Sequence, residues 1–239
     1  MKNPIYSIII PLKDEEGNIT SLVEEIRQVM EQLGEPWELI CVDDGSQDTT
    51  PQILESLQKE LTCMRTLTFE RNYGQSSAFD AGFKEAKGEY LITLDGDGQN
   101  DPKDIPKLTA LAGEFDLICG IRQKRKDPPH KKIISKIANK VRRAICDDGA
   151  QDTGCSLKLY RRECLSKIKM YSGMHRFLPA LFVIEGYRVG QQPVSHRERK
   201  SGKTKYNFFN RSFNTVADLF AVRWMKKRQL RYRIKDRAQ

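Results

Sequence analysis

The chain has 239 residues, 38% of them hydrophobic and 31% charged, and a formal net charge of +9 at pH 7. These totals describe a soluble globular protein with one large domain, and no apolar run approaches the roughly 18–20 residues of a membrane-spanning helix. The positive charge favours anionic partners such as nucleic acid, anionic lipid or phosphorylated substrates, or it serves solubility alone.

Strands alternate with helices along the first 122 residues. Short apolar, β-branched runs predict strands at 6–12, 37–46, 64–70, 89–95 and 115–122. Apolar residues at helical spacing predict helices at 18–34, with Gly34 as C-cap, and at 48–61, 74–88 and 101–113. The alternation predicts an α/β fold with a mostly parallel, doubly wound sheet flanked by helices. Beyond residue 122 we expect a basic, then irregular, and finally helical chain.

The cysteines and the first residues indicate the compartment. Six cysteines are scattered without a C-x-x-C pair, so we expect reduced thiols in the cytosol. The strand pattern starts almost at the first residue, so we expect no signal peptide.

Polar residues follow four of the expected strands. The segments are "PLKDEEG", "VDDGSQD", "ERNYGQ" and "DGDGQ". In parallel sheets of this kind, ligands bind beyond the carboxyl ends of the strands. We therefore expect the functional site at that edge of the sheet.

The fourth of these segments carries two aspartates, Asp95 and Asp97, separated by one glycine. Two carboxylates on one turn suit Mg²⁺ or Mn²⁺, which keep coordination positions for water and substrate phosphates. Gln99 adds a ligand or a hydrogen bond. The same residue types also form ordinary turns, so this short pattern is weak by itself. The glycine patterns of dinucleotide-binding and P-loop proteins are absent.

Five ordered motifs carry a family resemblance: "SIIIPLKDEEGNI", "LICVDDGSQDTT", "RNYGQSSAFDAG", "LITLDGDGQNDP" and "DTGCSLKLYRRE". Together they resemble family-2 glycosyltransferases with the GT-A fold, over roughly residues 5–225. The most similar branch transfers sugars to polyprenyl phosphates, and includes dolichyl-phosphate mannose synthases and undecaprenyl-phosphate sugar transferases. The resemblance implies inverting, Mg²⁺- or Mn²⁺-dependent transfer from a GDP- or UDP-linked sugar to a polyprenyl phosphate at the cytoplasmic membrane face.

The resemblance also implies roles for individual residues. It implies nucleotide contacts by Pro11, Glu16, Asp43 and Asp44, and a metal site formed by Asp95, Asp97 and Gln99. It implies that Asp152 is a carboxylate on the acceptor side. It also implies a basic clamp for phosphate, formed by Arg199, Lys203 and Lys205. Arg197 and Lys200 lie beside the clamp, which leaves open which basic side chain binds phosphate.

Arg122, His175 and Arg176 are further candidates for the acceptor side. Arg122 ends the fifth expected strand, and arginine binds phosphate bidentately. The alternative for Arg122 is an exposed loop arginine. His175, with Arg176, either lines the acceptor side or is a structural histidine.

Two basic stretches remain. Residues 130–145 read as a basic amphipathic helix, which either lies in a membrane interface or packs on the core. We expect a catalytic domain at 1–210 and a basic amphipathic tail at 211–239, where Phe220 and Trp224 share one helical face. Because many relatives continue here into spanning helices, we expect a monotopic protein, one that relies on a membrane partner protein, or a shortened chain.

Two other functions compete with lipid-phosphate glycosylation. Transfer to a polysaccharide or protein hydroxyl would make Asp152 an indispensable base. A non-catalytic basic module would bind lipid or nucleic acid. The acidic strand ends would repel phosphate polymers, and no nucleic-acid-binding motif is present, so we expect no nucleic-acid partner.

Overall fold

The computed structural model describes residues 3–123, 142, 149–198, 208–230 and 232. Most of the expected helix at 130–145 therefore lies outside the described residues. The expected division at residue 210 stays a prediction, and helix α8 (Phe208–Arg228) runs across that position.

One sheet of seven strands forms the centre of the described chain. The strands are β1 (Tyr6–Leu12), β2 (Trp37–Asp43), β3 (Met64–Thr68), β4 (Tyr90–Thr93), β5 (Leu117–Arg122), β6 (Lys158–Arg161) and β7 (Val189–Val194). Their order is β3-β2-β1-β4-β6-β5-β7. All neighbouring pairs are parallel except those that β6 makes with β4 and β5. The prediction of a mostly parallel sheet is confirmed.

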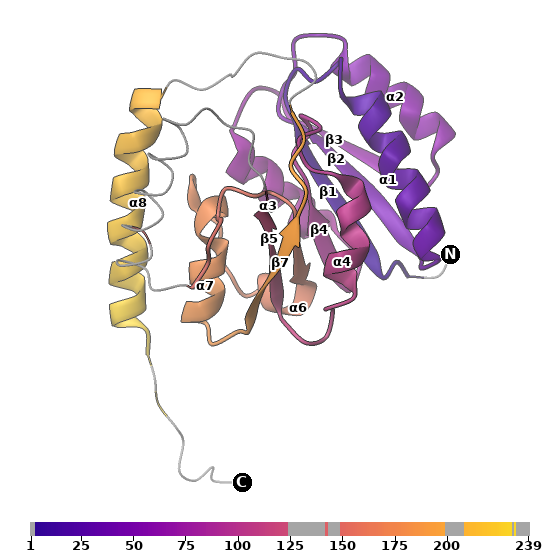
Figure 1. Cartoon of the computed structure of the whole chain (residues 1–239). Coiled ribbons are helices and arrows are strands. Elements are labelled where there is room, and N and C mark those ends of the chain that lie inside the picture. The colour runs from indigo at the N-terminus through magenta and orange to yellow at the C-terminus, as the bar shows by residue number, and fades with distance from the viewer. Residues whose placement is uncertain (1–2, 124–141, 143–148, 199–207, 231, 233–239) are drawn as a thin grey trace, which may run out of the picture.

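Helices cover both faces of the sheet, which gives three layers (Figure 1). Besides α8, the described residues form the helices α1 (Ile19–Leu33), α2 (Thr50–Glu60), α3 (Gln75–Glu85), α4 (Ile105–Thr109), α6 (Arg162–Leu165) and α7 (Leu178–Ile184). Two 3₁₀ turns, η1 (Pro102–Asp104) and η2 (Met174–Phe177), precede α4 and α7. None of the described helices combines the length and the apolar character that crossing a bilayer requires.

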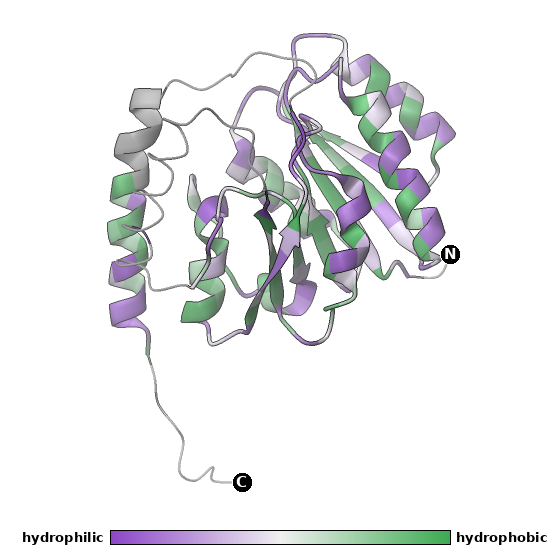
Figure 2. Cartoon of the chain, in the orientation of Figure 1, coloured by the Kyte–Doolittle hydropathy of each residue, from purple (hydrophilic) through white to green (hydrophobic). Residues whose placement is uncertain are grey.

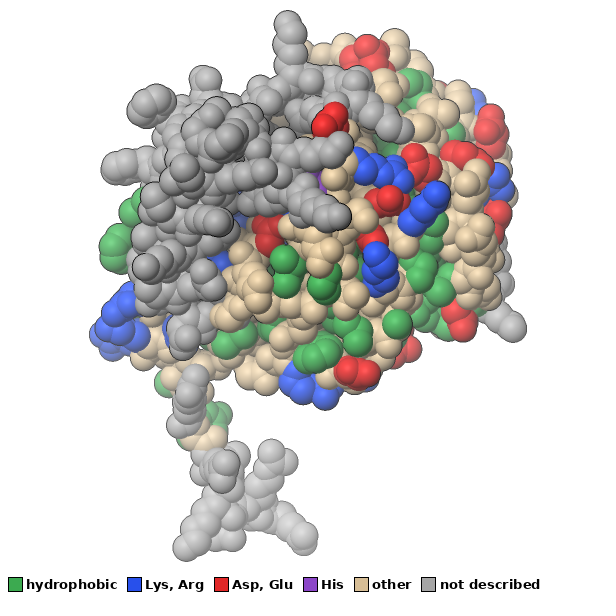
Figure 3. All heavy atoms as spheres, viewed as in Figure 1, with side chains coloured by type: hydrophobic (Ala, Val, Ile, Leu, Met, Phe, Trp, Pro, Cys, Tyr) green, Lys and Arg blue, Asp and Glu red, His purple; other side chains and the backbone are tan. Residues whose placement is uncertain are grey.

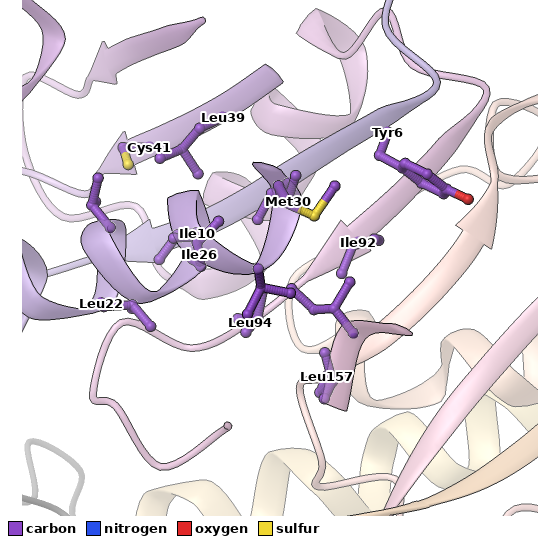
Figure 4. Close-up of a cluster of buried hydrophobic side chains, with 14 of the residues drawn as sticks. Tyr6, Ile10, Leu22, Ile26, Met30, Leu39, Cys41, Ile92, Leu94 and Leu157 are labelled. Carbon is purple, nitrogen blue, oxygen red and sulfur yellow. The ribbon is translucent and has the colours of Figure 1, made fainter. Parts of the chain in front are cut away.

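Each face of the sheet has its own hydrophobic core. Strand side chains such as Ile10, Leu39 and Ile92 pack against Ile26 and Met30 of α1 (Figure 4). On the other face, α3, α7 and α8 contribute side chains to a second cluster. The strands accordingly form a largely hydrophobic band between the helices (Figure 2). Burial on both faces explains why the strands read as continuous apolar runs.

Helix α1 shows how the local sequence sets the ends of an element. Its apolar residues recur at helical spacing and face the core. Gly34 ends the helix with φ +76°, and its N–H bonds to the carbonyl of Met30. Glycine adopts this left-handed conformation without the cost that a Cβ imposes, so Gly34 is the C-cap that the sequence predicts.

The region beyond residue 122 is more regular than expected. It contains β6, α6, α7 and β7, so the expectation of irregular structure there is wrong. Strand β6 is only four residues long, and its charged ends, Lys158 and Arg161, hide the strand pattern. Because β6 is antiparallel, its first residue lies opposite Thr93 and Cys119. The segment that precedes β6 therefore reaches the edge where β4 and β5 end.

Candidate active site

The carboxyl ends of β1, β2, β4 and β5 lie along one edge of the sheet, together with residues 152–156 before β6. The register aligns Leu12 of β1 with Asp43 of β2, and Ile9 of β1 with Thr93 of β4. Asp43 also pairs with Thr68 at the end of β3, so the polar segments that follow β1, β2, β3 and β4 meet at this edge as predicted.

Asp95 is held at the end of β4 by neighbouring elements. The Gln75 side-chain amide, at the start of α3, donates to Asp95 Oδ1 at 2.7 Å. The backbone N–H of Asp95 donates to Ser156 Oγ at 3.1 Å and to Asn100 Oδ1 at 3.3 Å. Asp97 is buried, and its Oδ1 accepts from the N–H of Gln99 at 3.1 Å. The predicted metal ligands therefore share one tight, braced turn.

The pKa of Asp95 is set by burial and by nearby charges of both signs. Burial raises the pKa of Asp95, the neighbouring Asp97 carboxylate raises it further, and Ser156, Lys158 and Arg122 oppose that rise. Lys158 is itself buried, and its ammonium donates to the Cys155 carbonyl. A divalent cation would relieve the repulsion between two carboxylates placed this closely.

The donor set of this turn fits Mg²⁺ or Mn²⁺. Two carboxylates and an amide oxygen are hard oxygen ligands of the kind these ions prefer. Among the described residues, no three His, Cys, Asp or Glu side chains gather into a complete metal cage. The two carboxylates and the amide would leave other coordination positions of such an ion open.

Asp43, at the end of β2, has an unusual carboxylate. Its side chain is fully buried, and Oδ1 accepts from the Ser46 N–H at 2.9 Å. Its Oδ2 is also buried, and no hydrogen-bond donor within the described part of the chain reaches it. A buried oxygen without a donor is costly, so it marks a point where a ligand N–H or O–H fits.

Asp44 is engaged by the protein itself. Its Oδ1 accepts from the Tyr73 N–H at 2.6 Å, and its Oδ2 from the Gly74 N–H at 2.9 Å, just before α3. Gly45, the residue after Asp44, has φ +70°. A Cβ at this position would lie 2.6 Å from the backbone carbonyl carbon of Arg71, too close for any residue but glycine. Asp44 thus ties the β2 end to the start of α3, and its predicted nucleotide contact stays a prediction.

The turn after β1 packs on the turn after β2. Glu16 is exposed, and its Oε2 accepts from the Thr49 N–H at 3.0 Å and the Thr49 hydroxyl at 2.5 Å, just before α2. Lys13 donates to the Gly45 carbonyl. Pro11 is half-buried beside Val42 of β2. Glu16 therefore braces α2 in this structure, while nucleotide contacts of Pro11 and Glu16 stay predictions.

Arg122 and Asp152, which the sequence presents separately, form one unit. Arg122 Nε donates to Asp152 Oδ2 at 2.7 Å, and Nη2 donates to Oδ1 at 2.9 Å. Their side chains are only 16% and 8% exposed. Gly154 allows this arrangement, because a Cβ there would lie 2.9 Å from Arg122 Nη2. Asp152 thus fixes the direction of the guanidinium near Asp95.

His175 belongs to a second link around α3. The hydroxyl of Ser76, the residue after Gln75, lies 2.6 Å from His175 Nδ1 and accepts from the Gly173 N–H at 3.0 Å. This ties the start of α3 to η2, close to the metal-binding turn.

Several supporting residues were not singled out from the sequence: Gln75, Ser76, Asn100, Ser156 and Lys158. All lie inside or next to the motifs that carry the family resemblance. Ser156 and Lys158 interrupt the apolar run "CSLKLY", which was a local signal, whereas Gln75, Ser76 and Asn100 lie in polar loop sequence and gave none. The predicted clamp residues Arg199, Lys203 and Lys205 lie outside the described residues.

Comparison with known proteins places these features in a family. The family model described as "Glycosyl transferase family 2" matches residues 7–169. Dodecaprenyl-phosphate galacturonate synthase of Rhizobium johnstonii is 37% identical over 231 residues, which cover 94% of this chain and 68% of that protein. Undecaprenyl-phosphate 4-deoxy-4-formamido-L-arabinose transferase of Salmonella paratyphi B is 35% identical over 215 residues, covering 89% of this chain and 65% of that protein. The chain thus spans about two thirds of the length of these curated relatives.

Solved structures share the fold at low sequence identity. The mannosyltransferase PcManGT of Pyrobaculum calidifontis, in complex with GDP-Man and Mn²⁺, has a TM-score of 0.65 and 18% identity, covering 92% of this chain and 64% of that one. Glucosyl-3-phosphoglycerate synthase of Mycobacterium tuberculosis, in complex with Mn²⁺ and UDP-Glc, has a TM-score of 0.72 and 16% identity, covering 92% and 79%. The expected GT-A-type fold is confirmed.

Proposed function

The chain belongs to glycosyl transferase family 2, and we propose on that basis that it transfers a sugar, with inversion, from a nucleotide-diphosphate sugar to a polyprenyl phosphate. Relatives with polyprenyl-phosphate acceptors in their names support this acceptor class. Neighbours with GDP-Man or UDP-Glc bound support the donor class.

The donor end of the site would use the strand ends already described. Asp95, Asp97 and Gln99 would hold Mg²⁺ or Mn²⁺, which supplies positive charge to the diphosphate as it leaves. The buried Oδ2 of Asp43 would accept a hydrogen bond from the nucleotide. Asp44 and Gln75 would keep these groups in place through their bonds to Gly74 and Asp95.

The bidentate pair of Arg122 and Asp152 is the observation that favours a phosphate acceptor. A lipid phosphate is already anionic at pH 7, so its oxygen attacks without a base. A carboxylate held by two N–H groups of a guanidinium is poorly placed to take a proton from a hydroxyl. In this proposal Asp152 orients Arg122 toward anionic groups, and catalysis comes from positioning and electrostatics.

Helix α8 supports peripheral contact with a membrane. Val216, Phe220 and Trp224 recur every four residues and are 51%, 61% and 64% exposed. On the opposite side Leu219 and Val222 are buried in the second core. The last turn of α8 is basic, with Lys226, Lys227 and Arg228. An exposed apolar stripe beside basic residues suits a membrane interface with anionic headgroups. We place this contact at the cytoplasmic face.

A donor and acceptor screen tests the proposed function. The purified protein is incubated with Mn²⁺ or Mg²⁺, with GDP- and UDP-linked sugars, and with a short-chain polyprenyl phosphate or its dephosphorylated alcohol. We expect transfer to the phosphate alone, with inverted configuration, and complete loss of activity in excess EDTA. Transfer to the alcohol would favour a hydroxyl acceptor, and activity in EDTA would refute the metal assignment.

The predicted clamp is tested on the acceptor side. We expect Arg199→Ala and Lys203→Ala to raise the KM for the polyprenyl phosphate and to leave donor binding unchanged. Unchanged acceptor kinetics in both variants would move the phosphate contact to Arg122.

A further inference from the structure

The four residues that follow β7, 195–198, lie against the turn that carries the proposed metal ligands. We call this segment the strap. The Ser195 N–H donates to Asp104 Oδ2 at 2.6 Å, and the Arg197 N–H donates to the Gln99 carbonyl at 2.9 Å. The strap therefore touches both the metal-binding turn and η1, although almost a hundred residues separate them in sequence.

The Arg197 side chain joins three elements at this point. Nη1 bonds to Glu25 Oε2 of α1 at 2.5 Å, and Nη2 bonds to Asp101 Oδ1 at 2.6 Å. Asp101 Oδ1 also accepts from the Lys103 N–H at 3.0 Å, which caps η1. One guanidinium thus links α1, the turn after the metal ligands and the strap.

This geometry answers a question that the sequence leaves open. Arg197 lies beside the predicted clamp and could itself bind phosphate. Both of its terminal nitrogens are instead bonded to carboxylates, and the side chains of Arg197, Glu25 and Asp101 are only 25%, 27% and 19% exposed. The Glu25 and Asp101 carboxylates, which contact the guanidinium directly, would also repel a phosphate placed beside it.

We propose that Arg197 is a positioning residue that anchors the strap to the metal-binding turn and so sets the distance between the donor diphosphate and the acceptor phosphate. This rests on the proposed function. Arg199, the first predicted clamp residue, is only two residues beyond Arg197. Because consecutive Cα atoms are about 3.8 Å apart, holding Arg197 in place limits how far Arg199 can lie from the metal-binding turn.

Removing the guanidinium would do more than delete two bonds. Glu25 and Asp101 would lose the cation that links them, and the strap would lose its side-chain bonds to α1 and to the turn after the metal ligands, while its backbone bonds to Gln99 and Asp104 would remain. A displacement of about 1 Å in a positioned reactant costs on the order of 100-fold in rate. We therefore expect a specific loss on the acceptor side.

The matched variants are Arg197→Met, Arg197→Lys and Arg188→Met. Arg188 precedes β7, at the opposite end of that strand, and is 59% exposed, with Nε 3.6 Å from Asp116 Oδ2. Arg188→Met is therefore the same substitution at a site far from the turn. Lysine can reach one of the two carboxylates, so Arg197→Lys should recover part of the function.

Two kinds of measurement decide the proposal. We expect Arg197→Met to raise the KM for polyprenyl phosphate at least about tenfold, with the affinity for nucleotide diphosphate and Mn²⁺ unchanged by calorimetry. Amide hydrogen exchange should increase at 195–198, independently of any acceptor. Arg197→Lys should lie between wild type and Arg197→Met, and Arg188→Met should match wild type.

Unchanged exchange at the strap in Arg197→Met would overturn the anchor. Faster exchange with an unchanged acceptor KM would overturn the positioning role while leaving the proposed function intact. If the wild type transfers sugar to no polyprenyl phosphate, the proposed function fails, and the positioning role falls with it.

Discussion

Removing Asp152 should reveal how strongly it is coupled to Arg122. Asp152→Ala deletes a carboxylate that bonds the guanidinium twice, at 2.7 and 2.9 Å, and the Arg122 side chain is only 16% exposed in the native structure. Removing one partner of a buried pair costs about 3–5 kcal/mol, whereas an exposed pair contributes about 0–1 kcal/mol. Because some solvent reaches Arg122, we expect the lower end of the buried range, about 3 kcal/mol.

Urea unfolding of a double-mutant cycle measures this coupling. With a slope of about 3 kcal/mol per M, the loss in Asp152→Ala moves the unfolding midpoint by about 1 M. Arg122→Met should be destabilising as well, because it leaves the Asp152 carboxylate without the guanidinium. The double variant should be more stable than the sum of the two losses predicts, by about 2 kcal/mol, because both single variants lose the same bidentate pair and the double variant loses it only once. Losses that simply add, within about 0.5 kcal/mol, would refute the reasoning.

Three other changes have defined outcomes. Asp97→Ala should lower the rate of sugar transfer at least about 100-fold, since a metal supplies several kcal/mol of charge stabilisation. Its circular dichroism spectrum should be unchanged, and normal activity would refute the metal role. The double variant Phe220→Ser/Trp224→Ser should sediment less with anionic liposomes, and wild-type binding should fall with added salt; equal sedimentation with neutral liposomes would contradict the role of charge. Gly45→Ala should lower the free energy of unfolding more than Gly34→Ala does. At both positions φ is positive, which costs an alanine about 1–2 kcal/mol, but only at Gly45 would the added Cβ also clash with backbone atoms.

The sequence was most informative where structure is local. The helix that ends at Gly34 and the strands before Asp43 and Asp95 follow from spacing and turn chemistry within about fifteen residues. The meeting of polar strand ends at one edge follows from the parallel order alone. These parts of the fold and of the metal-binding turn could be predicted with no knowledge of tertiary contacts.

Contacts between distant segments were not predictable in this way. The pair of Arg122 and Asp152 depends on where the antiparallel β6 enters the sheet, and β6 has too few residues for a periodic pattern. Asp44 and Glu16 look like ligand-binding carboxylates in the sequence, yet they accept hydrogen bonds from the starts of α3 and α2. A carboxylate at a strand end can serve either role, and only the positions of neighbouring N–H groups distinguish them.

Acidic and basic side chains are interspersed on the described part of the face in Figure 3. The net charge of +9 therefore does not translate into one continuous basic surface there. The apolar stripe of α8 is a more specific signal than total charge.

The place of β6 in the sheet also has a consequence for synthesis on the ribosome. Strand β4 pairs with β1 on one side as soon as both are made, but its other edge waits for β6, which ends at Arg161. From Thr93 at the end of β4 to Arg161 the chain grows by 68 residues (161 − 93), which translation at about 5–20 residues per second supplies in about 3–14 s. During that time the apolar edge with Leu91 and Ile92 is open to pairing with other nascent chains. A chain that stops before residue 161 lacks the strand that joins β4 to β5, so the first five strands cannot form one continuous sheet by themselves.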